Sequence, residues 1–225
     1  SLGEFDEARH AYRVIALPAA RLYHTSREVL AIKQALATVA TETGDFGGAI
    51  EILKDATEES GRLLGANHPD TLSSRNNLAL AYQAAGRLND AIPLLEKTLE
   101  VRTRILGPDH PNTLASRNNL AGAYQAAGRL NDAIPLLEKT LTDREQLLGP
   151  NHPNTLASRN NLAGAYQAAG RLNDAIPLLE KTLEAQTRIL GPNHPHTLTS
   201  RNNLAMAYAA ADKPFRSGEQ PGASA

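Results

Sequence analysis

The hydrophobic positions between residues 110 and 149 follow the period of an α-helix in two successive segments. In the first segment, Leu120, Ala121 and Tyr124 share one arc of a helical wheel, with Leu114 at its edge. The second segment carries a broader stripe made of Ala133, Ile134, Leu137, Leu141 and Leu148, extended by Leu136 and Leu147. No segment alternates with period two, as a half-buried strand would. The pattern predicts two amphipathic helices and no strands.

Polar residues, prolines and glycines at fixed places predict where these helices begin and end. The first helix is expected to end at the glycine of the sequence AAG, which suits a left-handed C-terminal cap. Its predicted N-caps are Asp70, Asn112 and Asn154. The predicted N-caps of the second helix are Asn89, Asn131 and Asn173, and its prolines are Pro93, Pro135 and Pro177. These prolines are expected in the first turn, where no N–H bond within the helix is lost.

Both predicted helices belong to a unit of 42 residues that recurs along the chain. The His-Pro pairs follow one another at this interval, at His68, His110, His152 and His194. Residues 110–151 match residues 152–193 everywhere except at positions 142–147 and their counterparts 184–189. One helix pair cannot bury both of its faces, whereas stacked neighbours can. The repeat therefore predicts a solenoid of stacked helix pairs.

A single array is expected over residues 1–211. It divides into a half repeat at 3–25, repeats at about 26–67, 68–109, 110–151 and 152–193, and a half repeat at 194–211. Residues 212–225 are rich in helix breakers and are expected to form a disordered tail. Because the chain does not begin with Met, we expect it to be a fragment of a longer protein.

The stretch NNLAGAYQAAGRLNDAIPLLEKTL resembles the tetratricopeptide repeat, with Leu-Ala, Tyr, Gly and Ala at matching intervals. The joint LGPDHPNTLASRNNLA is similar to that of the longer variety found in kinesin light chains and in many bacterial regulators. The resemblance implies an all-α fold, a right-handed superhelical solenoid of antiparallel helix hairpins with a concave groove. The chain departs from the family pattern at positions 75, 117, 159 and 201, where arginine replaces the more usual apolar residue.

Composition and charge narrow the possible functions. The chain of 225 residues has no cysteine, which excludes disulfides, thiolate catalysis and Cys-based metal sites. A formal net charge of −1 gives no field for holding nucleic acid or an anionic membrane, and no apolar run is long enough to span a bilayer. The sequence lacks the motifs of nucleotide-binding proteins, zinc proteases and serine hydrolases. We therefore expect a cytoplasmic protein that is not an enzyme, with no cofactor and no nucleic-acid or membrane partner.

Histidine is the only recurrent candidate for metal binding. Each repeat contributes one, before the proline of the loop between repeats. Stacked repeats separate equivalent residues by about 8–10 Å, whereas the ligands of one metal ion lie within about 2 Å of it. A role in shaping the loop is therefore expected rather than a metal site, although His194 and His196 form one local pair.

A second face of the first helix carries amides and small residues. On the helical wheel, Asn118, Gly122 and Gln125 share an arc with Ala115, and Asn119 lies beside them. The resemblance places this face along the concave groove, which predicts the peptide-binding residues Asn76, Asn77, Gln83, Asn118, Asn119, Gln125, Asn160, Asn161, Gln167, Asn202 and Asn203. Because amides both donate and accept, such a row suits the backbone of an extended, neutral or partly apolar peptide. The alternative is that the amides tie neighbouring helices together or face water.

The arginines that depart from the family pattern fall inside the apolar arc, where a guanidinium needs a carboxylate or several carbonyls. The second helix offers a glutamate at the edge of the core in each repeat. We therefore predict a structural ladder of the ion pairs Arg75–Glu96, Arg117–Glu138 and Arg159–Glu180. The residues expected in the core are Tyr82, Tyr124, Tyr166 and Tyr208. Those expected on a solvated outer face are Arg102, Arg104, Arg144 and Glu145.

These observations favour a protein-interaction scaffold that binds an extended peptide or a helix in a pre-formed, uncharged groove. The resemblance to bacterial regulators implies that the chain is part of a larger bacterial regulatory protein. The alternative is self-assembly, because the half repeats at 3–25 and 194–211 lack their partner helices and a second copy could complete them. The chain would then form a homo-oligomer.

Overall fold

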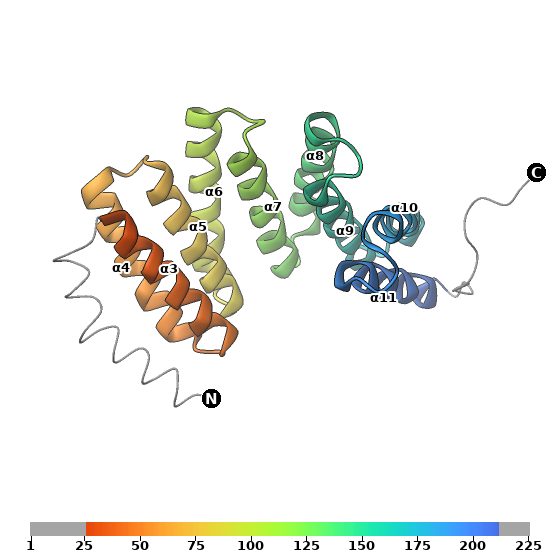
Figure 1. The fold of residues 1–225 in the computed structure, drawn as a ribbon, viewed down its shortest axis with the longest axis horizontal. Coiled ribbons are helices and arrows are strands. Elements are labelled where there is room, and N and C mark those ends of the chain that lie inside the picture. The colour runs from red at the N-terminus through yellow and green to blue at the C-terminus, as the bar shows by residue number, and fades with distance from the viewer. Residues whose placement is uncertain (1–25, 212–225) are drawn as a thin grey trace, which may run out of the picture. The chain divides into compact units, whose positions relative to one another are not determined.

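A computed structural model describes residues 26–211, and every regular element in that range is an α-helix (Figure 1). The first five helices are α3 (Ser26–Glu42), α4 (Phe46–Leu64), α5 (Pro69–Ala84), α6 (Leu88–Leu106) and α7 (Pro111–Ala126). They are followed by α8 (Leu130–Leu148), α9 (Pro153–Ala168), α10 (Leu172–Leu190) and α11 (Pro195–Ala210). The prediction of an all-α fold is confirmed. The half repeat predicted at 3–25 and the tail predicted at 212–225 lie outside the described residues.

The chain divides into two compact units between Ala127 and Gly128. The first helices of the repeats are α3, α5, α7, α9 and α11, and the second helices are α4, α6, α8 and α10. Within each unit every helix packs against the next one along the chain. First helices also contact first helices, α5 with α3 and α7 in one unit and α9 with α11 in the other. The second helices of one unit, α4 and α6 or α8 and α10, have no close backbone approach to each other.

Among the described helices, none combines the length and the apolar character that a bilayer-spanning helix requires.

Histidine caps the first helices α5, α7, α9 and α11, in place of the aspartate or asparagine predicted from the sequence. In each case the histidine Nδ1 accepts the backbone N–H of the second following residue over 3.1–3.2 Å. The capping residues are His68, His110, His152 and His194. The proline that follows is the physical reason: it starts the helix and holds the preceding residue in the extended conformation that an N-cap needs. The residues wrongly predicted as caps are Asp70, Asn112 and Asn154, which lie in the first turn and donate the N–H.

The second helices begin earlier than the sequence pattern predicts. α6 starts at Leu88, so Asn89 lies within its first turn and does not cap it. The equivalent residues of α8 and α10 are Asn131 and Asn173. Arg87 precedes α6, and its Nε donates to Asp90 Oδ2 over 2.8 Å. Because of the earlier start, Pro93 lies inside the helix rather than in its first turn. The same correction applies to Pro135 and Pro177.

The predicted apolar arcs form most of the core. In the first unit α7 buries Leu120, Ala121 and Tyr124, and in the second unit α8 buries Ala133 and Leu137. The far end of the predicted stripe is wrong, because Leu148 in the last turn of α8 is exposed, as is one apolar position that all four second helices share. The exposed residues at the equivalent position are Leu63, Ile105, Leu147 and Ile189.

Candidate functional site

The amides predicted to line a groove lie on the first helices, and in the first unit two of them bond to each other. Asn119 Nδ2 of α7 donates to Asn76 Oδ1 of α5 over 3.1 Å. The side chain of Asn76 is buried, so its carbonyl is directed to the neighbouring helix. This bond ties adjacent repeats together, which is the alternative that the sequence left open.

The second unit contains the same kind of tie between α9 and α11. Asn160 Nδ2 donates to Ser200 Oγ over 2.8 Å, and the Ser200 hydroxyl donates back to Asn160 Oδ1 over 3.2 Å. Gln167 Nε2 donates to the backbone carbonyl of Asn203 over 3.2 Å. Asn160 and Gln167 of α9 are therefore held in fixed orientations by α11.

Other amides of the predicted row remain at the surface. Exposed or half-buried members are Asn77, Gln83, Asn118, Gln125, Asn161, Asn202 and Asn203. One turn beyond Asn77 and Asn203, the apolar side chains of Leu80 and Met206 are also exposed. We define the amide face of each unit by its exposed and half-buried side chains, at residues 76–84 and 118–126 in the first unit and at residues 160–168 and 202–210 in the second. These four segments contain no charged residue, so hydrogen bonding and apolar contact are their available chemistry.

The glutamates of the predicted Arg–Glu ladder accept hydrogen bonds from tyrosines. In three places a tyrosine hydroxyl of a first helix donates to the glutamate of the preceding second helix. The pairs are Tyr124–Glu96, Tyr166–Glu138 and Tyr208–Glu180. The first two bonds are both 2.6 Å long. A helical wheel could not predict these partners, because it compares positions within one helix and not across the joint between repeats.

The Tyr–Glu bonds change the acidity of the tyrosines. Burial, together with the hydrogen bond to Glu138, raises the pKa of Tyr166 to about 12. The hydrogen bond to Glu180, together with burial, raises the pKa of Tyr208 to about 12. In both pairs the carboxylate accepts from the neutral phenol and disfavours a second negative charge beside it. Both phenols therefore remain neutral donors at ordinary pH.

Arg159 forms an ion pair with Glu145 and not with the predicted Glu180. It is only 6% exposed, and its Nη2 donates to Glu145 Oε1 over 2.6 Å and to the carbonyl of Pro150 over 3.4 Å. Glu145 belongs to α8, the helix directly before α9, and its side chain is 41% exposed, as predicted for the outer face, although it also pairs with Arg159. The predicted pair Arg117–Glu138 would join the two compact units and stays a prediction.

A buried ion pair of the predicted kind occurs one repeat earlier. Lys33 stands 42 residues before Arg75 and is fully buried. Its Nζ pairs with Asp55 Oδ2 over 2.8 Å and also with Glu59, both on α4 of the same repeat. In the next repeat a lysine and a valine stand at the positions of these two carboxylates. The choice of partner therefore depends on residues that differ between repeats.

Arg102 was predicted on a solvated outer face and is buried instead. Its Nη1 donates to Ser116 Oγ over 2.8 Å and to the carbonyl of Asn112 over 3.2 Å. Its Nη2 donates to Ser73 Oγ over 3.1 Å. One guanidinium of α6 therefore bonds to the first helices on both sides, α5 and α7.

Arg144 is also buried, which corrects the same prediction, and in the second unit it makes the bonds to the following first helix that Arg102 makes in the first. Its Nη1 donates to Ser158 Oγ over 2.7 Å and to the carbonyl of Asn154 over 3.1 Å. Burial lowers the pKa of both Arg102 and Arg144. The signal that could have revealed these bonds is a serine 14 residues after each arginine, inside an otherwise apolar arc.

Within residues 26–211 no three potential metal ligands from His, Asp and Glu come together. The rings of His194 and His196 lie 5.3 Å apart, and His194 Nδ1 accepts the backbone N–H of His196. This contact is the N-cap of α11, the loop-structuring role expected for the histidines.

Comparisons with known proteins find the same repeat. A family model described as tetratricopeptide repeat matches residues 28–103, 70–146, 116–187 and 159–214. The chain is similar to the nearly identical TPR-like repeats of a Podosopora anserina protein described as a kinesin light chain. The two are 37% identical over 84% of this chain and 89% of that chain, with a TM-score of 0.73. A search of the curated proteins finds no match.

Two more distant structures share the fold alone. BtubC (BKLC) from P. vanneervenii is 20% identical over 92% of this chain and 80% of its own, with a TM-score of 0.70. A signal transduction ATPase with a tetratricopeptide repeat sensor, from Pyrococcus horikoshii, is 17% identical over 88% of this chain and 30% of its own, with a TM-score of 0.68. With its helix pairs, its repeat and these matches, the chain belongs to the tetratricopeptide repeat proteins, whose repeats are generally protein–protein interaction scaffolds.

Proposed function

We propose that the chain binds an extended, neutral or partly apolar peptide of a partner protein along the amide face of each unit. The observation that carries this proposal is the lack of charged residues in all four segments of that face, combined with exposed amides and the exposed Leu80 and Met206. Amides match the N–H and C=O groups of a peptide backbone, and they do so without the cost of desolvating a charge. A strongly acidic or basic ligand would find no counter-charge there.

The hydrogen bonds between first helices support the proposal, because they hold part of the face in place before a ligand arrives. Asn76 and Asn119 bond to each other in the first unit, and Asn160 and Gln167 are held by α11 in the second. Side chains that are already ordered lose less conformational entropy on binding. The neighbouring amide of Asn77 is left at the surface for a ligand.

Selection of binders from a random peptide library on the full-length chain tests the proposal, and Gly122→Leu locates the site. Gly122 stands where α5 has Leu80 and α11 has Met206, so a long side chain suits this position. A Cβ atom there would lie 3.8 Å from Gln83 Nε2, which is an ordinary contact. We expect the selected peptides to be neutral, and the leucine to cover the face of α7 and weaken their binding about tenfold.

The matched control is Thr103→Leu, which adds the same side chain at an exposed position of α6. This variant is expected to bind the selected peptides as tightly as the unmodified chain. Selection of strongly charged peptides, or equal binding by Gly122→Leu and the unmodified chain, contradicts the proposal.

A place in a larger bacterial regulatory protein is a further part of the proposal, supported by the resemblance of the repeat joint to that of bacterial regulators. In such a protein the array would recognise a partner, and another domain would carry the response. The sequence of the whole gene tests this directly. A neighbouring signalling or nucleotide-hydrolysing domain is expected, and a gene that encodes the array alone contradicts it.

A second candidate function is self-association through α11, and one position favours it. Leu72, Leu114 and Leu156 are 1, 2 and 4% exposed, whereas the equivalent Leu198 is 41% exposed. α11 therefore presents apolar surface that other repeats bury, and a second copy could cover it. Sedimentation at rising concentration should show association that Leu198→Ser weakens. A strict monomer at high concentration rules this candidate out.

A further inference from the structure

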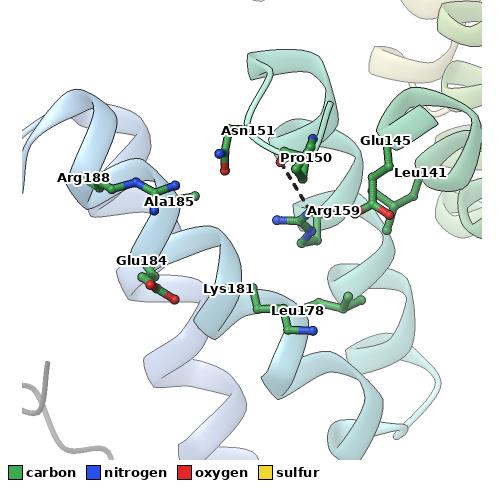
Figure 2. A pocket seen from close by; sticks show the side chains of 10 residues that line it. All are labelled: Leu141, Glu145, Pro150, Asn151, Arg159, Leu178, Lys181, Glu184, Ala185 and Arg188. Atoms are coloured by element: carbon green, nitrogen blue, oxygen red, sulfur yellow. Dashed lines mark hydrogen bonds and ion pairs between the residues drawn. The ribbon is translucent and has the colours of Figure 1, made fainter. Parts of the chain in front are cut away.

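An open hollow of about 660 Å³ lies in the second unit between the second helices α8 and α10 (Figure 2). Leu141 of α8 and Leu178 and Ala185 of α10 provide its apolar lining. The space exists because these two helices, unlike the first helices, have no close backbone approach to each other. None of its lining residues belongs to the amide face.

Charged side chains surround this apolar lining, and their charges do not cancel. Arg159 reaches from α9 into the middle of the lining residues, where its ion pair with Glu145 neutralises both groups (Figure 2). The other charged residues of the lining are Lys181, Glu184 and Arg188, all exposed. Two cations against one carboxylate leave one positive charge. The hollow therefore favours a ligand that is negatively charged.

Several lining residues of the hollow lie in the six positions of each repeat at which residues 110–151 and 152–193 differ. Glu145 lies within residues 142–147, and Ala185 and Arg188 lie within the counterpart segment 184–189. The small Ala185 keeps the hollow open. A binding preference specific to this place must come from these residues, because the rest of both repeats is the same.

We infer that this hollow binds an acidic peptide segment that carries an aliphatic side chain. The aliphatic side chain contacts Leu141, Leu178 and Ala185, and the flanking carboxylates pair with Lys181 and Arg188. Such a ligand differs from the neutral peptide proposed for the amide face, so the chain would offer two surfaces of different chemistry.

Fluorescence anisotropy with a labelled pentapeptide, Asp-Glu-Leu-Glu-Asp, tests the inference on the full-length chain. The double variant Lys181→Gln/Arg188→Gln removes both free cations and is expected to weaken binding about fivefold, as two exposed charge pairs would. The neutral peptide Asn-Gln-Leu-Gln-Asn and the peptide Asp-Glu-Gly-Glu-Asp, which lacks the aliphatic side chain, are each expected to bind more weakly. Both substituted residues are exposed, so the circular dichroism spectrum should not change.

The matched control is Lys97→Gln/Arg104→Gln, which removes two cations at the equivalent positions of α6 in the first unit. This variant is expected to keep the affinity of the unmodified chain. Equal loss in both double variants, full binding by Lys181→Gln/Arg188→Gln, equally tight binding of the neutral peptide, or no binding of the acidic peptide overturns the inference. Gly122→Leu should leave this affinity unchanged, so failure here is distinct from failure at the amide face.

Discussion

A histidine before a proline can cap a helix as asparagine does, provided that its Nδ1 carries no proton. At His110 this atom accepts the backbone N–H of Asn112, so the proton of the neutral ring lies on Nε2. The imidazole thus satisfies one of the N–H groups that every helix start leaves open. A residue type that first suggested metal binding therefore has a structural role in every first helix from α5 to α11.

Replacing the capping histidine should destabilise the fold. For His110→Ala we expect the free energy of unfolding in urea to fall by about 1 kcal/mol, because the cap acceptor is lost. His110→Asn keeps an acceptor and should restore most of that loss. His196→Ala is the control, since this residue donates only its backbone N–H to the cap of α11. Equal losses for His110→Ala and His110→Asn would count against the cap.

Alkaline pH should weaken the joints held by Tyr–Glu bonds. The pKa of Tyr166 and of Tyr208 is raised from the ordinary 10.0 to about 12 in the folded chain. Their contribution to stability is therefore complete below pH about 10 and is lost as the pH rises towards about 12. Phenolate absorbance in the ultraviolet measures this, and Glu138→Gln should bring the pKa of Tyr166 down. An unchanged titration in that variant would show that the bond is not the cause.

The serines that accept hydrogen bonds from the buried arginines should contribute measurably to the free energy of unfolding. Ser116→Ala removes an acceptor from Arg102 and should lower the free energy of unfolding by about 1.5–3 kcal/mol, the range for hydrogen bonds to charged groups. Ser74→Ala is the matched control at the equivalent position of α5, where the hydroxyl donates to the carbonyl of Asp70 in its own helix. Equal losses in the two variants would mean that the guanidinium is not involved.

At the scale of helices, local patterns predicted which segments are helical and that no strand occurs, because periodicity and punctuating glycines act within a few residues. Helix starts were less predictable. Capping preferences favour Asp70 over His68, because aspartate and asparagine rank highest at the N-cap, whereas the proline after His68 holds that histidine in the conformation that a cap needs. Partners such as Glu145 for Arg159 could not be predicted, because they depend on how one repeat sits on the next.

Substitution by alanine at two glycines of the first unit should change the free energy of unfolding in opposite directions. Gly86 has φ +73° with no atom near a Cβ position, so only its left-handed backbone opposes a side chain. Gly86→Ala should therefore lower the free energy of unfolding by about 1–2 kcal/mol. Gly122 lies inside α7 with space for a Cβ atom. Gly122→Ala should therefore raise the free energy of unfolding by about 0.5–1 kcal/mol. Chemical denaturation measures both, and equal signs would contradict this reading.

For the whole molecule, near-identical repeats suggest that stability is a sum over repeats and the joints between them. Deletion of residues 110–151 joins Asp109 to His152 and restores the same joint sequence. We expect a folded, shorter chain with unchanged helix content per residue and a lower free energy of unfolding. Circular dichroism during thermal unfolding measures both quantities. Deletion of residues 131–151 alone removes one second helix and should prevent cooperative unfolding, so equal behaviour of the two deletions would contradict the view.

The described hydrogen bonds of the Tyr–Glu pairs and of Arg144, and two of the three bonds of Arg102, join a second helix to the first helix that follows it, while the third bond of Arg102 runs back to Ser73. A sequence repeat consists of a first helix and the second helix that follows it. Most of these hydrogen bonds instead join a second helix to the first helix of the next repeat. A truncation after a second helix leaves its glutamate without the tyrosine donor and its arginine without the serine acceptor. A truncation after a first helix leaves these Tyr–Glu and Arg–Ser pairs complete. Arrays of this kind should accordingly be shortened or joined after a first helix, and not at the boundary between two sequence repeats.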